Sequence, residues 1–199
     1  MKSSVAPVGP GPNCFSDSPA NVSVDAGGRL HLEITQSNER WLCAEVINTR
    51  SLGHGRYAFE LGSRVDDVDA NVVLGLFTWS DDPSFSNREL DIELSRWGNA
   101  ADLTNGQYVV QPYDRIGNLR RVSQLAVASC THSFDWQPNA VAFESSNATP
   151  SSWTYSGTDV PPPGAEHVRI NLWLYRGALP TSGKAVEAIV DRFFFTPAR

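Results

Sequence analysis

The sequence lacks the two features that would place it in a membrane or on nucleic acid. No apolar run approaches the roughly 18 to 20 residues that a membrane-spanning helix requires. No cluster of Lys and Arg is present to neutralise phosphates, and the 199 residues carry a net charge of −6. We therefore expect a soluble protein with neither a membrane nor a nucleic acid as partner. The same acidity would repel a sulfated or uronic polymer, so a neutral glycan fits better.

The chain also lacks the short motifs that mark several classes of enzyme. It has no HExxH motif, no Gly-x-Ser-x-Gly nucleophile elbow and no glycine-rich phosphate loop. Its histidines do not have the close spacing of a zinc site. They are His31, His54, His132 and His167. We therefore expect no catalytic metal, no cofactor for catalysis and no serine-hydrolase mechanism.

Cysteine is scarce, with only three in the chain. We interpret Cys14 and Cys43 as a disulfide that attaches the N-terminal segment to the sheet, and Cys130 as a buried free thiol. The alternative, three reduced core cysteines in a cytosolic protein, stays open. Residues 1–12 contain no apolar core of a secretory signal, and we expect that such a segment has been trimmed.

Helical periodicity is absent too, and alternation of apolar and polar residues takes its place. Segments with one apolar face are separated by turns rich in Gly, Pro, Asn and Asp. The clearest are residues 30–34, 57–61, 90–94 and 168–174. This pattern predicts an all-β sandwich or barrel. We expect one domain over residues 13–199, preceded by an irregular Pro/Gly-rich arm of residues 1–12.

Three carboxylates alternate with three aliphatic residues over residues 89–94. On a strand, Glu89, Asp91 and Glu93 share one face, and the aliphatic side chains share the other. Residues i and i+4 have Cα atoms roughly 13 Å apart, so inward-leaning glutamates leave about 5 Å between their carboxyl groups. That separation is typical of a retaining glycosidase, with one Glu as nucleophile and the other as acid/base. A solvated acidic face is the alternative, and the pattern alone does not separate the two.

A second strand, residues 167–175, carries polar and aromatic side chains on the face away from the core. Asn171, Trp173 and Tyr175 share that face. An indole ring covers the apolar face of a pyranose, and an amide bonds its hydroxyl groups. The strand therefore suits a sugar-binding cleft, although a Trp covered by a neighbouring loop would give the same pattern.

Several segments of the sequence resemble motifs of glycoside hydrolase family 16, in the form carried by the bacterial lichenases. Glu89–Glu93 read E-L-D-I-E, which resembles the catalytic signature of that family. Further matches follow in the family's order over almost the whole chain. They are Cys43-Ala44-Glu45, Gly53–Tyr57, F-D-W-Q-P at Phe134–Pro138, Asn171–Trp173 and Val190-Asp191.

The resemblance implies a concanavalin A-like jelly roll of two curved antiparallel sheets, with the substrate cleft on the concave face. It implies that Glu89 is the nucleophile, Asp91 the assisting residue and Glu93 the acid/base. The sugar contacts that it implies are Glu45, Gln111, Tyr113, Asn171 and Trp173. Many relatives hold a structural calcium on the convex face, and Asp191 stands where one ligand would come from, with backbone carbonyls as others. The 29-residue spacing of Cys14 and Cys43 resembles the lichenase disulfide and implies secretion.

Several positions depart from the lichenase pattern. Ile47 stands where that subgroup has an Arg, Asn87 where it has a Trp, and Val8 where a binding Asn is expected. The loop after Trp173 also lacks a second Trp. Losing an aromatic platform and an Arg donor would weaken or redirect at least one glucose subsite.

We therefore expect a secreted, monomeric, retaining endo-β-glycanase. Its substrate would be a neutral polysaccharide, either mixed-linkage β-1,3-1,4-glucan or β-1,3-glucan. Other specificities of the family stay open, namely galactanase, agarase or transglycosylase. A non-catalytic glycan-binding module on the same fold also stays open, although a binding protein has no need of a nucleophile and an acid in register.

Overall fold

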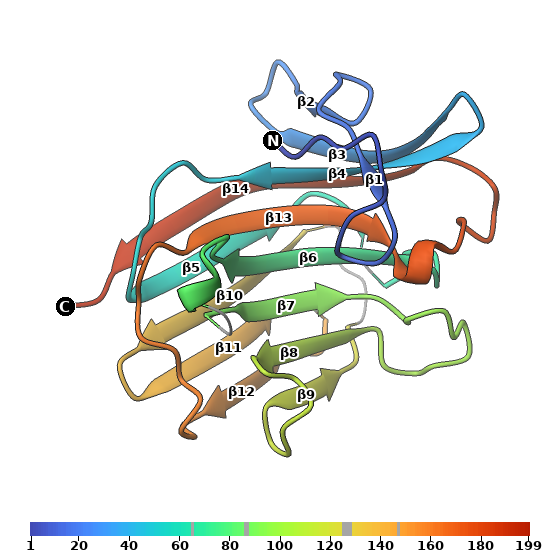
Figure 1. The fold of residues 1–199 in the computed structure, drawn as a ribbon. Helices are drawn as coiled ribbons and strands as arrows, with labels where there is room; N and C mark the ends of the chain where they lie inside the picture. Colours follow the sequence, from blue (N-terminus) through green and yellow to red (C-terminus); the bar gives the residue numbers. More distant parts are fainter. Residues whose placement is uncertain (65, 86–87, 125–128, 147) are drawn as a thin grey trace.

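The computed structural model describes residues 1–199 with the exception of 65, 86–87, 125–128 and 147. The described chain is built from strands that form two facing layers (Figure 1). The strands are β1 (Cys14–Phe15), β2 (Val22–Val24), β3 (Leu30–Ser37), β4 (Arg40–Ile47), β5 (Gly55–Leu61), β6 (Val72–Trp79), β7 (Leu90–Leu94), β8 (Gly106–Val110), β9 (Leu119–Val122), β10 (Cys130–Gln137), β11 (Ala140–Ser146), β12 (Ser151–Tyr155), β13 (His167–Leu174) and β14 (Val186–Pro197). Two short 3-10 helices, η1 (Pro83–Phe85) and η2 (Tyr175–Gly177), complete the elements. None of the described helices is long and apolar enough to cross a membrane.

Hydrogen bonds connect the strands in the order β12-β11-β10-β5-β14-β3-β4-β13-β6-β7-β8-β9. The two layers meet at the hairpin of β3 and β4, where Thr35 lies opposite Leu42. The hairpin turns at Asn38 and Glu39, both with positive φ, which suits a tight two-residue turn. The strand pairs in this order are antiparallel, whereas β1 pairs with β4 in parallel. The all-β jelly roll expected from the sequence is confirmed.

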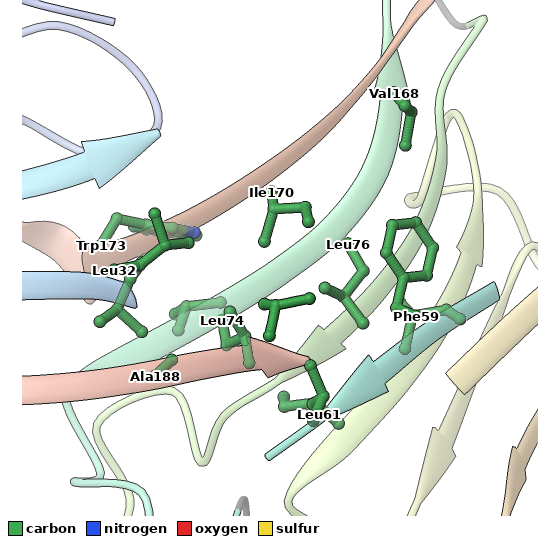
Figure 2. Close-up of a cluster of buried hydrophobic side chains, with 14 of the residues drawn as sticks. Leu32, Phe59, Leu61, Leu74, Leu76, Val168, Ile170, Trp173 and Ala188 are labelled. Carbon is green, nitrogen blue, oxygen red and sulfur yellow. The ribbon is translucent and has the colours of Figure 1, made fainter. Parts of the chain in front are cut away.

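The core lies between the two layers and is filled from both. Figure 2 shows part of it, with Leu74 and Leu76 of β6 near Phe59 and Leu61 of β5. On the far side of the core, Tyr108 of β8 stacks on Phe143 of β11, with ring centroids 5.2 Å apart. Alternate side chains of each strand point toward the core and toward the outer face. The outer face of the β13-β6-β7 layer is therefore free to carry a site.

The N-terminal arm, residues 1–12, is attached to this layer. It contains no strand, but the Lys2 amide donates to the Glu45 carbonyl at 3.0 Å and the Ser4 amide to the Phe15 carbonyl at 2.9 Å. An isolated bridge between Val8 and Asn13 closes its last turn. These bonds hold the arm beside β4 and β1.

A buried polar chain crosses the core between the layers. His132 on β10 lies 2.7 Å from the Ser145 hydroxyl through Nδ1 and 3.2 Å from the Cys130 sulfur through Nε2. The Tyr108 hydroxyl donates to Ser145 at 2.7 Å from the opposite layer. Cys130 is a buried free thiol, as predicted, and burial raises its pKa to about 11. The pair of Cys130 and His132 is therefore neutral.

We expect the free energy of unfolding to decrease as the pH falls from 7 to 4.5, in part because His132 stays neutral in the folded protein. Burial lowers the pKa of His132 from 6.5 to about 4. Between these values the unfolded chain binds a proton that the folded chain excludes. The contribution of His132 to the free energy of unfolding is thus present in full above pH 6.5 and is lost as the pH falls toward 4. Between pH 7 and pH 4.5 the loss amounts to roughly 2 to 3 kcal/mol. Denaturant titrations of the wild type and His132→Gln at both pH values measure it.

The variant should lose this part of the pH dependence, because the carboxyl groups titrate equally in both proteins. His31→Gln is the matched control. The hydrogen bond to Glu187 raises the pKa of His31, so its contribution has the opposite sign and is lost as the pH rises. An identical pH dependence in the wild type and His132→Gln would contradict the assignment.

Candidate active site

A cleft of about 580 Å³ lies on the concave outer face of the layer that contains β4, β13, β6 and β7. This volume is in the range of sites that bind small molecules or short stretches of a polymer. The lining residues come from the arm (Lys2, Gly9, Pro10), β4 (Glu45, Ile47), β6 and the turn after it (Gly75, Phe77, Trp79, Asp81), the β7 segment (Glu89, Asp91, Glu93) and β13 (Arg169, Asn171, Trp173). Segments far apart in the sequence thus share one wall.

The carboxylates of the β7 segment all line this cleft. Glu89 comes directly before β7, and Asp91 and Glu93 lie on it, while the three aliphatic residues that alternate with them are fully buried in the core. The observed faces match the alternation in the sequence. A solvated acidic face, the alternative interpretation of the pattern, does not fit three carboxylates that line a cleft with Asp91 only 4% exposed.

Enclosure in the cleft shifts the pKa values of the three carboxyl groups. Burial is the largest cause in each case, and it raises the pKa of Glu89 to about 7 and the pKa of Asp91 well above its usual value. The charges of Glu89 and Glu93 add to the effect at Asp91, and a hydrogen bond with Asp91 opposes it at Glu89. Burial also raises the pKa of Glu93. We infer that the cleft holds a proton donor and a carboxylate together near neutral pH.

Two glutamine amides support these acids from β8 and the residue after it. Gln111 donates through Nε2 to Asp91 at 3.1 Å and accepts the Tyr113 amide at 2.9 Å. Gln107 donates through Nε2 to Glu93 at 2.5 Å. Both amides therefore donate hydrogen bonds directly to the acidic side chains.

Glu45 is the centre of a charged cluster in the cleft wall. It is 1% exposed, and one oxygen accepts Arg169 at 3.0 Å while the other accepts Lys2 at 3.2 Å and Asn171 at 3.4 Å. Arg169 also donates to Asp81 at 2.6 Å. Both oxygens of Glu45 are thus engaged within the protein, so a direct sugar contact there would require exchange of a partner. The side-chain oxygen of Asn171 is buried and accepts no hydrogen bond from the described residues.

Arg169 is a cleft residue that the sequence reasoning missed. It lies directly opposite Ile47 in the pairing of β13 with β4. Both residues line the cleft, so Arg169 brings a guanidinium to it beside Ile47. Its position two residues before Asn171 was a signal, because alternate residues of a strand share a face.

Aromatic side chains line the cleft on β6 and β13. Trp173, predicted as a sugar contact, lines it at 8% exposure, below the arm at Gly11. Trp79 was not predicted, although it is 38% exposed and its indole nitrogen donates to Asp81 at 3.1 Å. Gly75, Phe77 and Trp79 alternate along β6, and this period was the available signal.

Two other predicted sugar contacts lie outside this wall. Neither Gln111 nor Tyr113 is among the described residues that line the cleft. Tyr113 is 64% exposed. Of the departures from the lichenase pattern, Asn87 lies outside the described residues, and Val8 is on the exposed surface of the arm.

The predicted disulfide between Cys14 and Cys43 is not formed in the structure, where both are free thiols. In the pairing of β1 with β4, Cys14 lies opposite Leu42, and Cys43 lies opposite Phe15. The two cysteines are therefore one residue out of register. Burial raises the pKa of Cys43 to about 12.

Asp191, the predicted calcium ligand, lies at an irregularity in β14 between Val190 and Arg192. Its carboxylate packs against Gly62, where a Cβ atom would lie 2.5 Å from Oδ1. The described residues contain no group of three His, Cys, Asp or Glu side chains that could hold a metal. An ion at Asp191 would thus depend on backbone carbonyls and water for its other ligands.

Comparison with known proteins identifies the fold of the chain. No protein-family model and no curated protein sequence matches the chain. Solved structures do match, among them the Bacillus licheniformis β-glucanase, which is 20% identical with a TM-score of 0.77 over 99% of this chain and 91% of that chain. A pseudo β-1,3-glucanase of Mycobacterium tuberculosis is 18% identical (TM-score 0.68, 98% and 87% covered), and a transglycosylase in complex with NAG is 17% identical (0.65, 90% and 77%). The chain therefore has the jelly-roll fold of these proteins, and at such identities the likeness concerns the fold alone.

Proposed function

We propose that the protein is a retaining endo-β-glycanase of the family 16 type. The observation that carries the proposal is the placement of Glu89, Asp91 and Glu93 in one cleft on a β-glucanase fold. Retaining hydrolysis needs a nucleophile and an acid/base about 5 Å apart, and residues i and i+4 of one strand suit that distance.

The proposed reaction is a double displacement. Glu89 attacks the anomeric carbon while Glu93 protonates the leaving oxygen, which produces a glycosyl ester on Glu89. Glu93 then removes a proton from water, and the water cleaves the ester. Asp91 retains its proton and donates a hydrogen bond to Glu89, which favours the ionised nucleophile and opposes in part the effect of burial on its pKa.

The proposed substrate is a neutral β-glucan, mixed-linkage β-1,3-1,4 or β-1,3. The acidic cleft and the net charge of −6 disfavour a polyanion. Trp79 and Trp173 offer aromatic surface on two sides of the cleft. On the basis of the family resemblance we also propose that the protein is secreted, is a monomer and binds a structural calcium at Asp191.

The test is release of reducing sugar from barley β-glucan, laminarin and related neutral polymers by purified protein. Release from one of them supports the proposal, and mass spectrometry of the products identifies the linkage. Products longer than the donor would assign a transglycosylase instead. Binding without release, equal in the wild type and Glu89→Gln, would assign a glycan-binding module, a result in keeping with the pseudo-glucanase of the same fold.

We expect a bell-shaped dependence of kcat/KM on pH, with both limbs above the ordinary carboxyl range near pH 4. The acidic limb reports ionisation of the nucleophile and the basic limb loss of the proton from the acid/base. Burial raises the pKa values of Glu89, Asp91 and Glu93, so each limb moves upward. Initial rates at low substrate between pH 3 and 10 measure the profile, and a flat profile would contradict the assignment.

A further inference from the structure

Glu93 belongs to a row of side chains that crosses three strands. Glu93 on β7 lies opposite Gln107 on β8, and Gln107 lies opposite Arg121 on β9. Gln107 donates through Nε2 to Oε2 of Glu93 at 2.5 Å, and Arg121 donates through Nη1 to Oε1 of Gln107 at 3.4 Å. We call these three residues the Glu93 ladder.

Arg121 is itself held in place at the outer end of the ladder. Its guanidinium donates to the Thr104 hydroxyl at 2.7 Å and to Asp102 at 2.8 Å. It also lies over the Trp97 ring, 3.9 Å from the centroid. With so many contacts the group has little freedom to rotate, so it presents Nη1 to Gln107 in a fixed direction.

The order of donors along the ladder determines the state of Glu93. A guanidinium has only donors, so the amide of Gln107 must turn its oxygen toward Arg121 and its NH₂ group toward Glu93. Oε2 of Glu93 must then accept a hydrogen bond and cannot itself carry a proton toward Gln107. When Glu93 is protonated, the proton is left to Oε1.

We propose that Gln107 and Arg121 are positioning residues that orient the Glu93 carboxyl and assign its acidic proton to Oε1. The proposal rests on the proposed role of Glu93 as acid/base and deepens it. Without Arg121 the amide of Gln107 could rotate and accept a hydrogen bond from a protonated Oε2, which would turn the acidic proton toward β8 and away from a leaving oxygen.

Few other groups near Glu93 could orient its carboxyl group or shift its pKa. Asp91 shares its strand and Glu89 directly precedes that strand. Gly75, which is uncharged, faces Glu93 from β6, and Arg169 of β13 lies in the same cleft, bonded to Glu45 and Asp81. Burial raises the pKa of Glu93, and the Gln107 bond and the Arg121 charge lower it. Loss of either ladder residue should therefore raise the pKa of Glu93 and move the basic limb to higher pH.

The test compares Arg121→Met with Arg120→Met. Both remove one positive charge from β9, but Arg120 lies opposite Tyr108 rather than Gln107. For a glucan, we expect kcat/KM of Arg121→Met to fall roughly 10- to 100-fold, with an upward shift of the basic limb and little change in KM. For an aryl glycoside with an activated leaving group, which needs no proton, the loss should be much smaller. In a Glu93→Ala background the effect of Arg121→Met should vanish.

A readout without turnover separates this proposal from the proposed function. The Glu93 side-chain carbon, assigned by its absence in Glu93→Gln, can be titrated by ¹³C NMR in the wild type and both Arg variants. An upward shift in Arg121→Met alone supports the ladder even if no glucan is cleaved. Equal titration and equal kinetics of the two Arg variants would overturn it. If Arg121→Met does not fold, Gln107→Met makes the same comparison with Arg121 left on Asp102 and Thr104.

Discussion

Replacing Glu89 by glutamine is expected to lower kcat/KM on the preferred glucan by roughly 10⁴- to 10⁶-fold, the largest effect of any single change in the cleft. Glutamine keeps the size of the side chain but provides no anionic oxygen to attack the anomeric carbon. The fold should persist, because burial already disfavours the charged form of Glu89, whose pKa is raised to about 7. We expect a melting temperature equal to or above that of the wild type at pH 7.

The matched control for this change is Glu144→Gln, which removes a carboxylate from an exposed ion pair with Arg56 on the opposite layer. Its activity should equal that of the wild type. The shorter variant Glu89→Ala leaves room for azide, which should restore cleavage of an activated β-glycoside and yield the α-glycosyl azide. Undiminished hydrolysis by Glu89→Gln would place the nucleophile on another residue.

The shared face of the three carboxylates could be predicted from the sequence because it depends only on local alternation. Strict alternation over Glu89–Glu93 determines which side chains share a face, and no distant contact is needed to decide it. The enclosure that raises the pKa values of these acids comes from β6, β13 and the arm, so its extent could not be derived from the segment itself.

Contacts between segments that are distant in the chain could not be predicted from the sequence. Lys2 lies in an arm with no periodicity, yet it reaches Glu45, which is 43 positions away. Arg169 follows the same alternation as Asn171, but its role opposite Ile47 depends on the register of β13 with β4. The predicted disulfide is not formed in the structure, and the register that places Cys14 opposite Leu42 is likewise not determined by spacing along the chain.

The Glu93→Ala variant should divide substrates by the acidity of their leaving groups. For a glucan, whose leaving oxygen needs a proton, we expect kcat/KM to fall roughly 10³- to 10⁴-fold, as for loss of a general acid. For an aryl β-glycoside with a nitrophenol leaving group, formation of the glycosyl ester on Glu89 needs no proton and should stay close to the wild-type rate. Breakdown of the ester, which loses its base, then limits turnover, so a burst of nitrophenol should precede a slow steady state.

Azide distinguishes the two glutamates by stereochemistry. In Glu93→Ala it should attack the glycosyl ester on Glu89 from the face that the leaving group vacated and yield the β-glycosyl azide. In Glu89→Ala it takes the place of the nucleophile and yields the α-anomer, so ¹H NMR of the two products assigns the two roles independently. An equal loss on glucan and aryl glycoside in Glu93→Ala, with no β-azide formed, would show that another group supplies the proton. Because Gln107 loses its partner in this variant, the melting temperature should be measured beside the kinetics to separate a lost proton from a lost fold.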